Sequence, residues 1–241
     1  MSSESGTAQG RVAVVVFPGS NCEHDVAHAL TLLGAQPELV WHRQTDLAGF
    51  DGVVLPGGFA HGDYLRTGAI ARFSPVMAAV ERTAAAGLPV LGICNGFQIL
   101  CEAGLLPGAL VANRDLKFIC RAIHVRVESA DSVLTSRAEA GDVLQIPLNS
   151  FEGNYIAPER DLEALEATGR VVLRYCDSSG AVVGESNVNG STNAIAGITN
   201  EAGNVIGVMP HPERAVEAIL GSTDGLVLLE SFVAGLSPVR A

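Results

Sequence analysis

The sequence predicts an α/β fold: an open, mostly parallel β-sheet flanked by helices, with a mixed or antiparallel extension. In the first half of the chain, short and continuously apolar runs alternate with helical patterns, which is typical of parallel strands covered on both faces. After about residue 119, apolar and polar residues alternate and turn residues become frequent, which is typical of half-exposed strands. The second pattern predicts the extension.

Each element follows from its local pattern. Strands are expected at 11–17, 37–42, 52–55, 89–93, 121–128, 171–176 and 205–209. Helices are expected at 23–33, 70–86, 95–102, 212–220 and 225–234. In the first helix the apolar residues recur at intervals of three and four, and Gly34 and Gly87 stand where the first two helices should end.

The composition is that of a globular protein with one domain. Of 241 residues, 48% are hydrophobic and 17% are charged, and no composition shift or linker divides residues 11–241. Residues 1–10 are polar and lack the apolar core of a signal peptide, so we expect a short disordered lead. No apolar run approaches the ~18 residues that a membrane-spanning helix needs. We therefore expect a cytoplasmic protein without membrane contact.

Charge and cysteine content exclude several classes of function. The formal net charge is −11 and Lys117 is the single lysine, which disfavours nucleic acid or an anionic membrane as a partner. The five cysteines show no CxxC pair and no metal-ligand spacing, so we expect free thiols and no metal site.

Cys94 is the candidate nucleophile. It lies between Gly92 and Gly96, where the expected strand 89–93 passes into the expected helix 95–102, and this arrangement is typical of a nucleophile elbow. The free amides and positive dipole end of a helix N-terminus favour the reactive thiolate. A buried structural cysteine in the same turn is the alternative.

His211 is the candidate base. It follows the buried strand 205–209, and strands of open α/β sheets present reactive residues at their carboxyl ends, so His211 should lie near Cys94. Glu213 lies two residues further along, on the same face of an extended segment, where it could orient the imidazole. The alternative for this segment is an ordinary helix start, with proline and glutamate in the first turn.

The turn at 56–59 is the candidate oxyanion hole. Two glycines, Gly57 and Gly58, follow a strand there, so that the N–H of Gly58 and that of Asn95 could stabilise a developing negative charge. A simple tight turn is the alternative. Cys22 follows a similar loop, but no base is expected at comparable spacing, and Cys101 is expected in the core.

Together, these motifs resemble the class I, or triad, glutamine amidotransferases. Pro-Gly-Gly-Phe, Gly-x-Cys-x-Gly-x-Gln and His-Pro-Glu occur in that order. Within the family, the chain is most similar to glutaminase subunits of an ATP-dependent, amidine-forming synthase of purine biosynthesis. The segments that carry this closer similarity are 17–22, 62–66, 94–98, 189–191, 196–198 and 209–214.

The resemblance implies a flavodoxin-like fold and a role for each matching residue. Cys94 would attack the side-chain amide of glutamine, with His211 as general base and acid and Glu213 as its partner. Gly58 and Asn95 would form the oxyanion hole. Gln98, one helical turn beyond the nucleophile, and Gly57 would help to hold glutamine.

The resemblance also implies partners. A large synthetase subunit and a small accessory subunit would complete the complex. Because this chain has no nucleotide-binding glycine-rich loop, it should bind no cofactor itself, and ATP and Mg²⁺ should bind the synthetase. Ammonia released here would be used there, so the free subunit should be poorly active.

One segment departs from the family pattern. Residues 149–155 keep Glu152 and Gly153 but lack the histidine that the family commonly has, so the role of this segment stays open. Two rival functions also stay open: another cysteine hydrolase on the same sheet, such as a peptidase or deglycase, and a non-catalytic binding subunit. The intact Cys94, His211 and Glu213 argue against the second.

Overall fold

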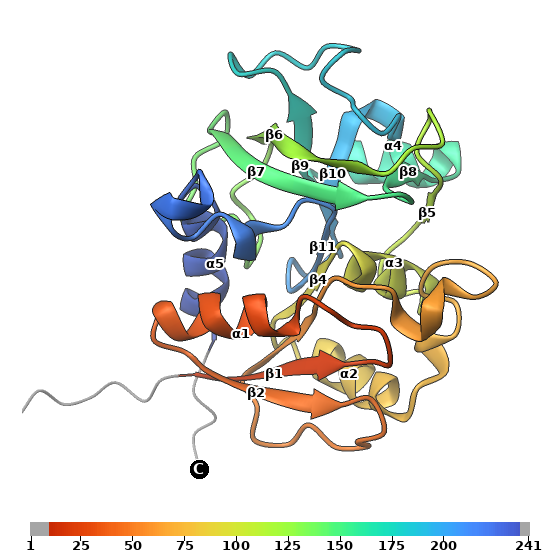
Figure 1. The fold of residues 1–241 in the computed structure, drawn as a ribbon, viewed down its shortest axis with the longest axis vertical. Coiled ribbons are helices and arrows are strands. Elements are labelled where there is room, and N and C mark those ends of the chain that lie inside the picture. The colour runs from red at the N-terminus through yellow and green to blue at the C-terminus, as the bar shows by residue number, and fades with distance from the viewer. Residues whose placement is uncertain (1–9, 237–241) are drawn as a thin grey trace, which may run out of the picture.

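The computed structural model describes residues 10–236 and contains one nine-stranded sheet that spans both halves of the chain (Figure 1). In spatial order its strands are β2 (Gln36–Trp41), β1 (Arg11–Val16), β3 (Gly52–Leu55), β4 (Val90–Ile93), β11 (Val205–Val208), β10 (Ile195–Thr199), β9 (Val171–Cys176), β6 (Ile119–Val127) and β7 (Val143–Ser150). The expected N-terminal lead lies outside the described residues, apart from Gly10.

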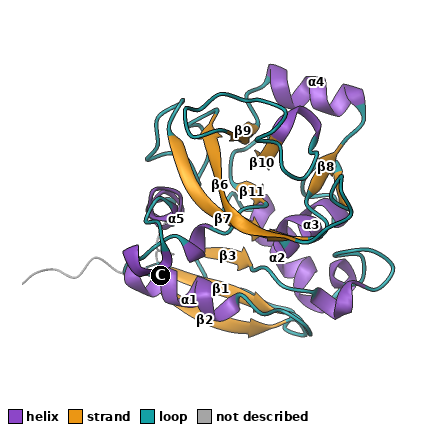
Figure 2. Ribbon diagram, turned by 45° about the horizontal axis from the view of Figure 1, so that its top comes forward, coloured by secondary structure: helices purple, strands orange, loops and turns teal. Residues whose placement is uncertain are grey.

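The first five strands in this order, β2 to β11, are parallel. β3 and β4 are buried along their whole length, and so is most of β1, which explains their continuously apolar sequences. α1 (Glu23–Leu32) contacts α5 (Gly225–Ala234), whereas α2 (Pro75–Ala85) and α3 (Asn95–Glu102) pack on β3 and β4. The sheet is therefore covered by helices where it is parallel, as the sequence predicts (Figure 2).

The remaining strands form the antiparallel extension, in which β10, β9, β6 and β7 pair in turn. This half curls back, so that β7 lies close to the end of β11: the N–H of His211 donates a hydrogen bond to the carbonyl of Pro147 at 2.8 Å. Pro147 lacks an N–H and is tolerated because β7 is an edge strand.

Several elements lie outside the sequence-based expectations. They are β7, β10, the two-stranded sheet of β5 (Ala109–Val111) and β8 (Asn154–Ile156), and α4 (Glu159–Ala167). β10 is buried on both faces and contains glycine and alanine, so it shows no alternation. β7 does alternate between buried and half-buried residues, and this signal was available in the sequence.

Two expected helices are wrong in extent. Residues 70–86 do not form one helix: a 3₁₀ turn occupies Ala71–Phe73, Ser74 is extended with ψ of 141°, and α2 begins at Pro75. A residue before proline disfavours the helical conformation, which explains the break. Residues 212–220 form two separate 3₁₀ turns, Pro212–Arg214 and Ala218–Leu220, because Glu217 between them is extended.

Among the described residues, no helix combines the length and apolar character needed to cross a membrane.

Gly96 sets how closely α3 approaches the sheet. A Cβ on Gly96 would lie 1.9 Å from the carbonyl oxygen of Leu55 at the end of β3, and backbone cannot move aside as a flexible side chain can. A Cβ on Gly92 would likewise meet the backbone of Gly96 at 2.7 Å. These two glycines therefore allow the first turn of α3 to lie directly on β3 and β4.

We expect Gly96→Ala to lower the free energy of unfolding by about 3 kcal/mol, because overpacking against backbone costs roughly this much. Gly184→Ala is the matched control, since nothing lies within 4 Å of its added Cβ, and it should change stability by less than about 0.5 kcal/mol. Urea unfolding followed by circular dichroism measures both. Equal stability of the two variants would contradict this account of α3 packing.

Candidate active site

The loops that follow β1, β3, β4 and β11 meet at one edge of the sheet. Because these strands are parallel, their carboxyl ends share that edge. A cavity of about 340 Å³ lies there, and its lining includes Cys22, Gly58, Cys94 and His211, one residue from each loop. The topology thus brings together candidates that lie up to 189 residues apart.

Cys94 occupies the turn between β4 and α3. Its φ of 50° and ψ of −105° are unusual for a residue with a side chain, and its N–H donates to the carbonyl of Val208 at 2.7 Å. The side chain faces the cavity with the residue 7% exposed, and Sγ lies 3.5 Å from the carbonyl oxygen of Asn149 in β7. This strained strand-to-helix turn presents the sulfur to the cavity.

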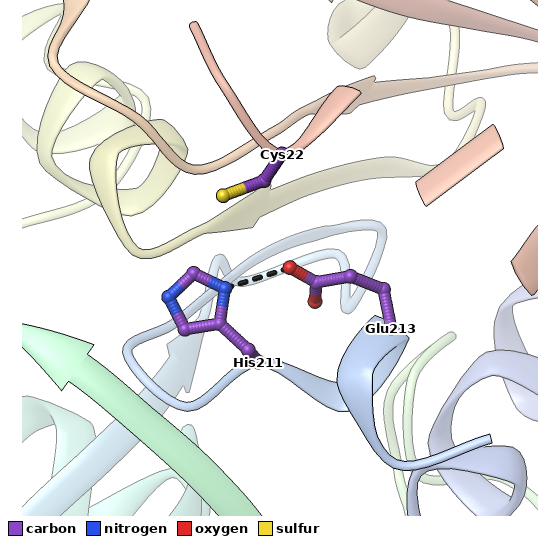
Figure 3. Close-up of side chains that lie close together, drawn as sticks. All are labelled: Cys22, His211 and Glu213. Carbon is purple, nitrogen blue, oxygen red and sulfur yellow. Dashed lines mark hydrogen bonds and ion pairs between the residues drawn. The ribbon is translucent and has the colours of Figure 1, made fainter. Parts of the chain in front are cut away.

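His211 and Glu213 form a buried pair at the end of β11 (Figure 3). Nδ1 of His211 lies 2.7 Å from Oε1 of Glu213, and the two residues are 1% and 2% exposed. The contact is made across the 3₁₀ turn Pro212–Arg214, so the expectation of an extended segment is wrong although the two side chains meet. Nε2 of His211 has no hydrogen-bond partner in the described part of the chain.

The surroundings of His211 favour its charged form. Burial lowers the pKa of His211, but the negative charge of Glu213, followed by that of Cys94, outweighs burial and raises the pKa well above its usual value. A cationic imidazole can stabilise a thiolate at Cys94. The base next to the candidate nucleophile is therefore suited to carry a proton.

Gly58, which lines the same cavity as Cys94, and Asn95, the residue that follows Cys94, offer backbone donors to the site. Within residues 10–236, no hydrogen bond uses the N–H of either residue. Gly58 has a φ of 147°, and a Cβ there would lie 2.7 Å from Cα of Ser20. The Asn95 side chain is buried and accepts a bond from the N–H of Ala60 at 3.0 Å, which ties the start of α3 to the loop after β3.

Gln98 and Gly57 take different places in the site. Gln98 lines the cavity; its Nε2 donates to the carbonyl of Glu152 at 2.5 Å, and its Oε1 accepts from Asn95 at 2.9 Å. Gly57 packs behind the base, since a Cβ there would lie 2.7 Å from Cε1 of His211. Gly57 therefore holds the imidazole ring in place from behind.

Two carboxylates that line the cavity were not assigned a role from the sequence. Asp63 and Glu152 both line the cavity, and Glu152 accepts a hydrogen bond from the hydroxyl of Thr67. Burial, and after it the charge of Glu152, raise the pKa of Asp63 to about 6, against the opposing effect of a hydrogen bond from Asn95. Asp63 lies in segment 62–66 and Glu152 in segment 149–155, both of which the sequence motifs singled out. Their position in these segments was the signal that could have identified the two carboxylates.

Cys22 lies closer to the base than its spacing in the sequence suggested. Its sulfur belongs to the same buried cluster as His211 and Glu213, although the sequence offered no base candidate at comparable spacing (Figure 3). Nη2 of Arg214 lies 3.1 Å from this sulfur, and Arg214 also pairs with Asp25 at 3.0 Å. The juxtaposition arises because β1 and β11 end at the same edge of the sheet.

Cys101 is buried, as expected, and burial raises the pKa of its thiol.

Comparison with known proteins decides the family. The model of the CobB/CobQ-like glutamine amidotransferase domain matches residues 9–224. The chain belongs to this family of glutamine amidotransferases. The match includes Cys94, His211 and Glu213, and it favours a glutamine amidotransferase over the peptidase and deglycase alternatives.

Relatives in this glutamine amidotransferase family extend the match over nearly the whole chain. The phosphoribosylformylglycinamidine synthase subunit PurQ of Streptomyces avermitilis is 56% identical, covering 92% of this chain and 96% of that protein. The subunit of the same name from Chlorobaculum parvum is 53% identical, covering 95% and 91%. A chain in the structure of PurLQS from Thermotoga maritima is 41% identical, with a TM-score of 0.85, and covers 95% of this chain and 100% of that one.

We expect His211→Asn to slow alkylation of Cys94 by iodoacetamide at neutral pH about tenfold or more. Loss of the neighbouring imidazolium removes the charge that favours the thiolate, and one pKa unit of interaction corresponds to a factor of ten. Peptide mass spectrometry measures the rate, and the exposed Cys120 provides an internal control in the same sample. An unchanged rate at Cys94 would show that the two side chains are not coupled.

Proposed function

We propose that this chain is the glutaminase subunit of phosphoribosylformylglycinamidine synthase. It hydrolyses glutamine and supplies ammonia to a synthetase subunit that converts formylglycinamide ribonucleotide to formylglycinamidine ribonucleotide in purine biosynthesis. The observation that carries this proposal is that Cys94 and His211 line one cavity, with Glu213 bonded to His211, in a chain more than 50% identical to subunits of that name.

In the first half of the reaction, the Cys94 thiolate attacks the side-chain amide carbon of glutamine. The amide oxygen becomes an oxyanion, which the N–H groups of Gly58 and Asn95 stabilise. His211 donates a proton from Nε2 to the departing nitrogen, so that ammonia leaves and a thioester remains on Cys94. Glu213 accepts the Nδ1–H of His211 throughout and keeps Nε2 directed at the reaction.

In the second half, water hydrolyses the thioester. His211, now neutral, takes a proton from the attacking water, and the same two N–H groups stabilise the second oxyanion. Glutamate leaves, and the thiolate–imidazolium pair is restored. The raised pKa of His211 suits a group that must hold a proton until ammonia departs.

Asp63 and Glu152 bind the α-ammonium group of glutamine in this proposal. Both face the cavity that contains Cys94, and their negative charges are complementary to an ammonium group. Gln98 contributes by holding the backbone of Glu152 in position, through the bond from its Nε2. This assigns a substrate role to the segment 149–155, whose departure from the family pattern left its role open.

The synthesis step belongs to partner subunits. The described residues form one catalytic cavity of this kind and contain no glycine-rich nucleotide loop, so we place ATP, Mg²⁺ and the ribonucleotide on a large synthetase subunit, with a small accessory subunit in the complex. We place the complex in the cytoplasm.

Glycine peptides such as Gly57–Gly58 reorient at low cost, and loss of one oxyanion donor lowers the rate ~10²–10³-fold. Assembly could therefore control the rate of hydrolysis.

We expect Cys94→Ala to abolish glutamine-dependent synthesis by the assembled complex while ammonia-dependent synthesis continues. The reason is that Cys94 acts on the amide alone. Product formation with either nitrogen source measures the two activities, and Cys120→Ser serves as the control that should retain both. Loss of ammonia-dependent synthesis in a folded Cys94→Ala complex would count against this division of labour.

Asp63 makes glutamine binding sensitive to pH. The carboxyl group has a pKa of about 6, so it is charged above pH 6 and gains a proton as the pH falls below that value. The KM for glutamine should therefore rise as the pH falls from 7 to 5. At pH 7 the KM of Asp63→Asn should be about tenfold higher than that of the unmodified chain, because loss of one charge-assisted hydrogen bond costs ~1.5 kcal/mol.

The decisive measurement is the pH profile of KM. In Asp63→Asn the rise of KM between pH 7 and pH 5 should be smaller, because the titrating carboxyl is absent, while Asp115→Asn at an exposed site should follow the unmodified chain. An unchanged KM in Asp63→Asn would remove this residue from the binding site.

A further inference from the structure

Beside the catalytic pair, Cys22 completes a cluster of three metal-ligating side chains (Figure 3). The sulfur of Cys22, a ring nitrogen of His211 and a carboxylate oxygen of Glu213 all lie within 4.8 Å of one another, and all three residues are buried. The hydrolysis of glutamine as derived above uses His211 and Glu213 and gives Cys22 no role. The presence of Cys22 in this cluster is therefore not explained by glutamine hydrolysis.

Two further observations point to a cation. The second carboxylate oxygen of Glu213, Oε2, is buried and has no hydrogen-bond partner within residues 10–236. A Cβ on Gly57 would lie 3.0 Å from the sulfur of Cys22 and 3.5 Å from Nδ1 of His211, so both atoms face the same small space. Nδ1 is also the nitrogen next to Glu213, at 2.7 Å from Oε1. Nδ1 is thus the natural ligand atom of the ring.

We propose that Cys22, His211 and Glu213 bind Zn²⁺ and that this binding inhibits the glutaminase. A thiolate, an imidazole and a carboxylate are the ligand types that zinc takes in proteins, with water as a fourth ligand. The negative charges of a Cys22 thiolate and of Glu213 balance the two charges of the ion. Arg214, which now contacts the sulfur of Cys22, would keep its second partner, Asp25.

The site is accessible and needs only a small adjustment. Zinc–ligand distances of ~2.0–2.3 Å place tetrahedral ligand atoms roughly 3.3–3.7 Å apart. Nδ1 of His211 and Oε1 of Glu213, now 2.7 Å apart, must therefore separate by roughly 0.6 Å, and the sulfur of Cys22, within 4.8 Å of both residues' ligand atoms, must approach by at most roughly 1.5 Å. Rotation of the short Cys22 side chain supplies such a shift. Cys22 and His211 both line the active-site cavity, which gives the ion a path from solvent.

Inhibition follows from the protons that zinc displaces. Binding releases the thiol proton of Cys22 and the proton on Nδ1 of His211 to solvent, and it breaks the bond between His211 and Glu213 without any change in oxidation state. The ring then keeps its remaining proton on Nε2. With zinc on Nδ1, His211 no longer alternates between its neutral and cationic forms, so it cannot transfer protons for Cys94.

The test is to titrate the metal-free chain with Zn²⁺ in competition with a chromophoric chelator. We expect one Zn²⁺ per chain in the unmodified protein, in Cys120→Ser and in Cys94→Ala. Cys22→Ser should weaken binding at least about 100-fold, since even indirect partners of a metal ligand are worth 10–100-fold. Because no glutamine is present, the result is independent of the proposed function.

Cobalt provides a second readout of the same ligand set. Co²⁺ bound to a thiolate gives a charge-transfer absorption, which should appear in Cys94→Ala and be absent in Cys22→Ser. Glutaminase activity with added Zn²⁺, taken relative to the rate of each variant without zinc, should be more resistant in Cys22→Ser than in Cys120→Ser. His211→Asn should also fail to bind zinc. If circular dichroism shows that Cys22→Ser is unfolded, His211→Asn serves as the test variant in its place.

Three results would overturn the proposal. They are no binding of Zn²⁺ by the unmodified chain, unchanged binding in folded Cys22→Ser, and loss of binding in Cys94→Ala with retention in Cys22→Ser. The last would mean that zinc bridges Cys94 and His211 on the other side of the ring.

Discussion

The site depends on holding Cys94 in a backbone conformation that is unfavourable for a residue with a side chain. A conformation of this kind costs of order 1–3 kcal/mol and persists only where the surrounding structure fixes it. Here the N–H of Cys94 is bound to the carbonyl of Val208, and α3 lies so close to β3 that Gly96 can carry no side chain. The strained turn directs the sulfur into the cavity and leaves the N–H of Asn95 free at the helix start.

The base is fixed from a different direction. His211 is held by its own N–H bond to β7, by Glu213 at Nδ1 and by the close approach of Gly57 behind the ring. The antiparallel extension thus has a function beyond burying apolar surface, because its edge strand curls over the site and contacts both Cys94 and His211. A rigid base opposite a rigid nucleophile is what proton transfer in both halves of the reaction requires.

The charges around the cavity separate two tasks. Glu213 is buried beside His211 and raises the pKa of the imidazole, whereas Asp63 and Glu152 line the cavity, where burial and the charge of Glu152 raise the pKa of Asp63. One carboxylate, Glu213, therefore adjusts the catalytic base, and the other two offer negative charge to a ligand. Arg214 contacts Cys22 and Asp25, and it connects α1 to the loop that carries the base.

The sequence by itself determined the parallel half of the sheet, the elbow at Cys94 and the identity of the candidate triad. These follow from local signals: continuous apolar runs, glycines flanking a cysteine, and histidine and glutamate after a buried strand. The sequence also carries the resemblance to glutamine amidotransferases, because the motifs occur in the family's order and are spread over nearly the whole chain.

Tertiary structure alone decided what depends on distant strands meeting. The helix expected at 70–86 begins only at Pro75 in the structure. His211 and Glu213 meet across a 3₁₀ turn, where an extended segment was expected. Cys22 reaches His211 only because β1 and β11 end at the same edge of one sheet, and the pKa of Asp63 is raised because the fold buries this carboxyl and brings Glu152 near it. No periodicity or spacing encodes such contacts, since they arise from strand order and from the curl of the sheet.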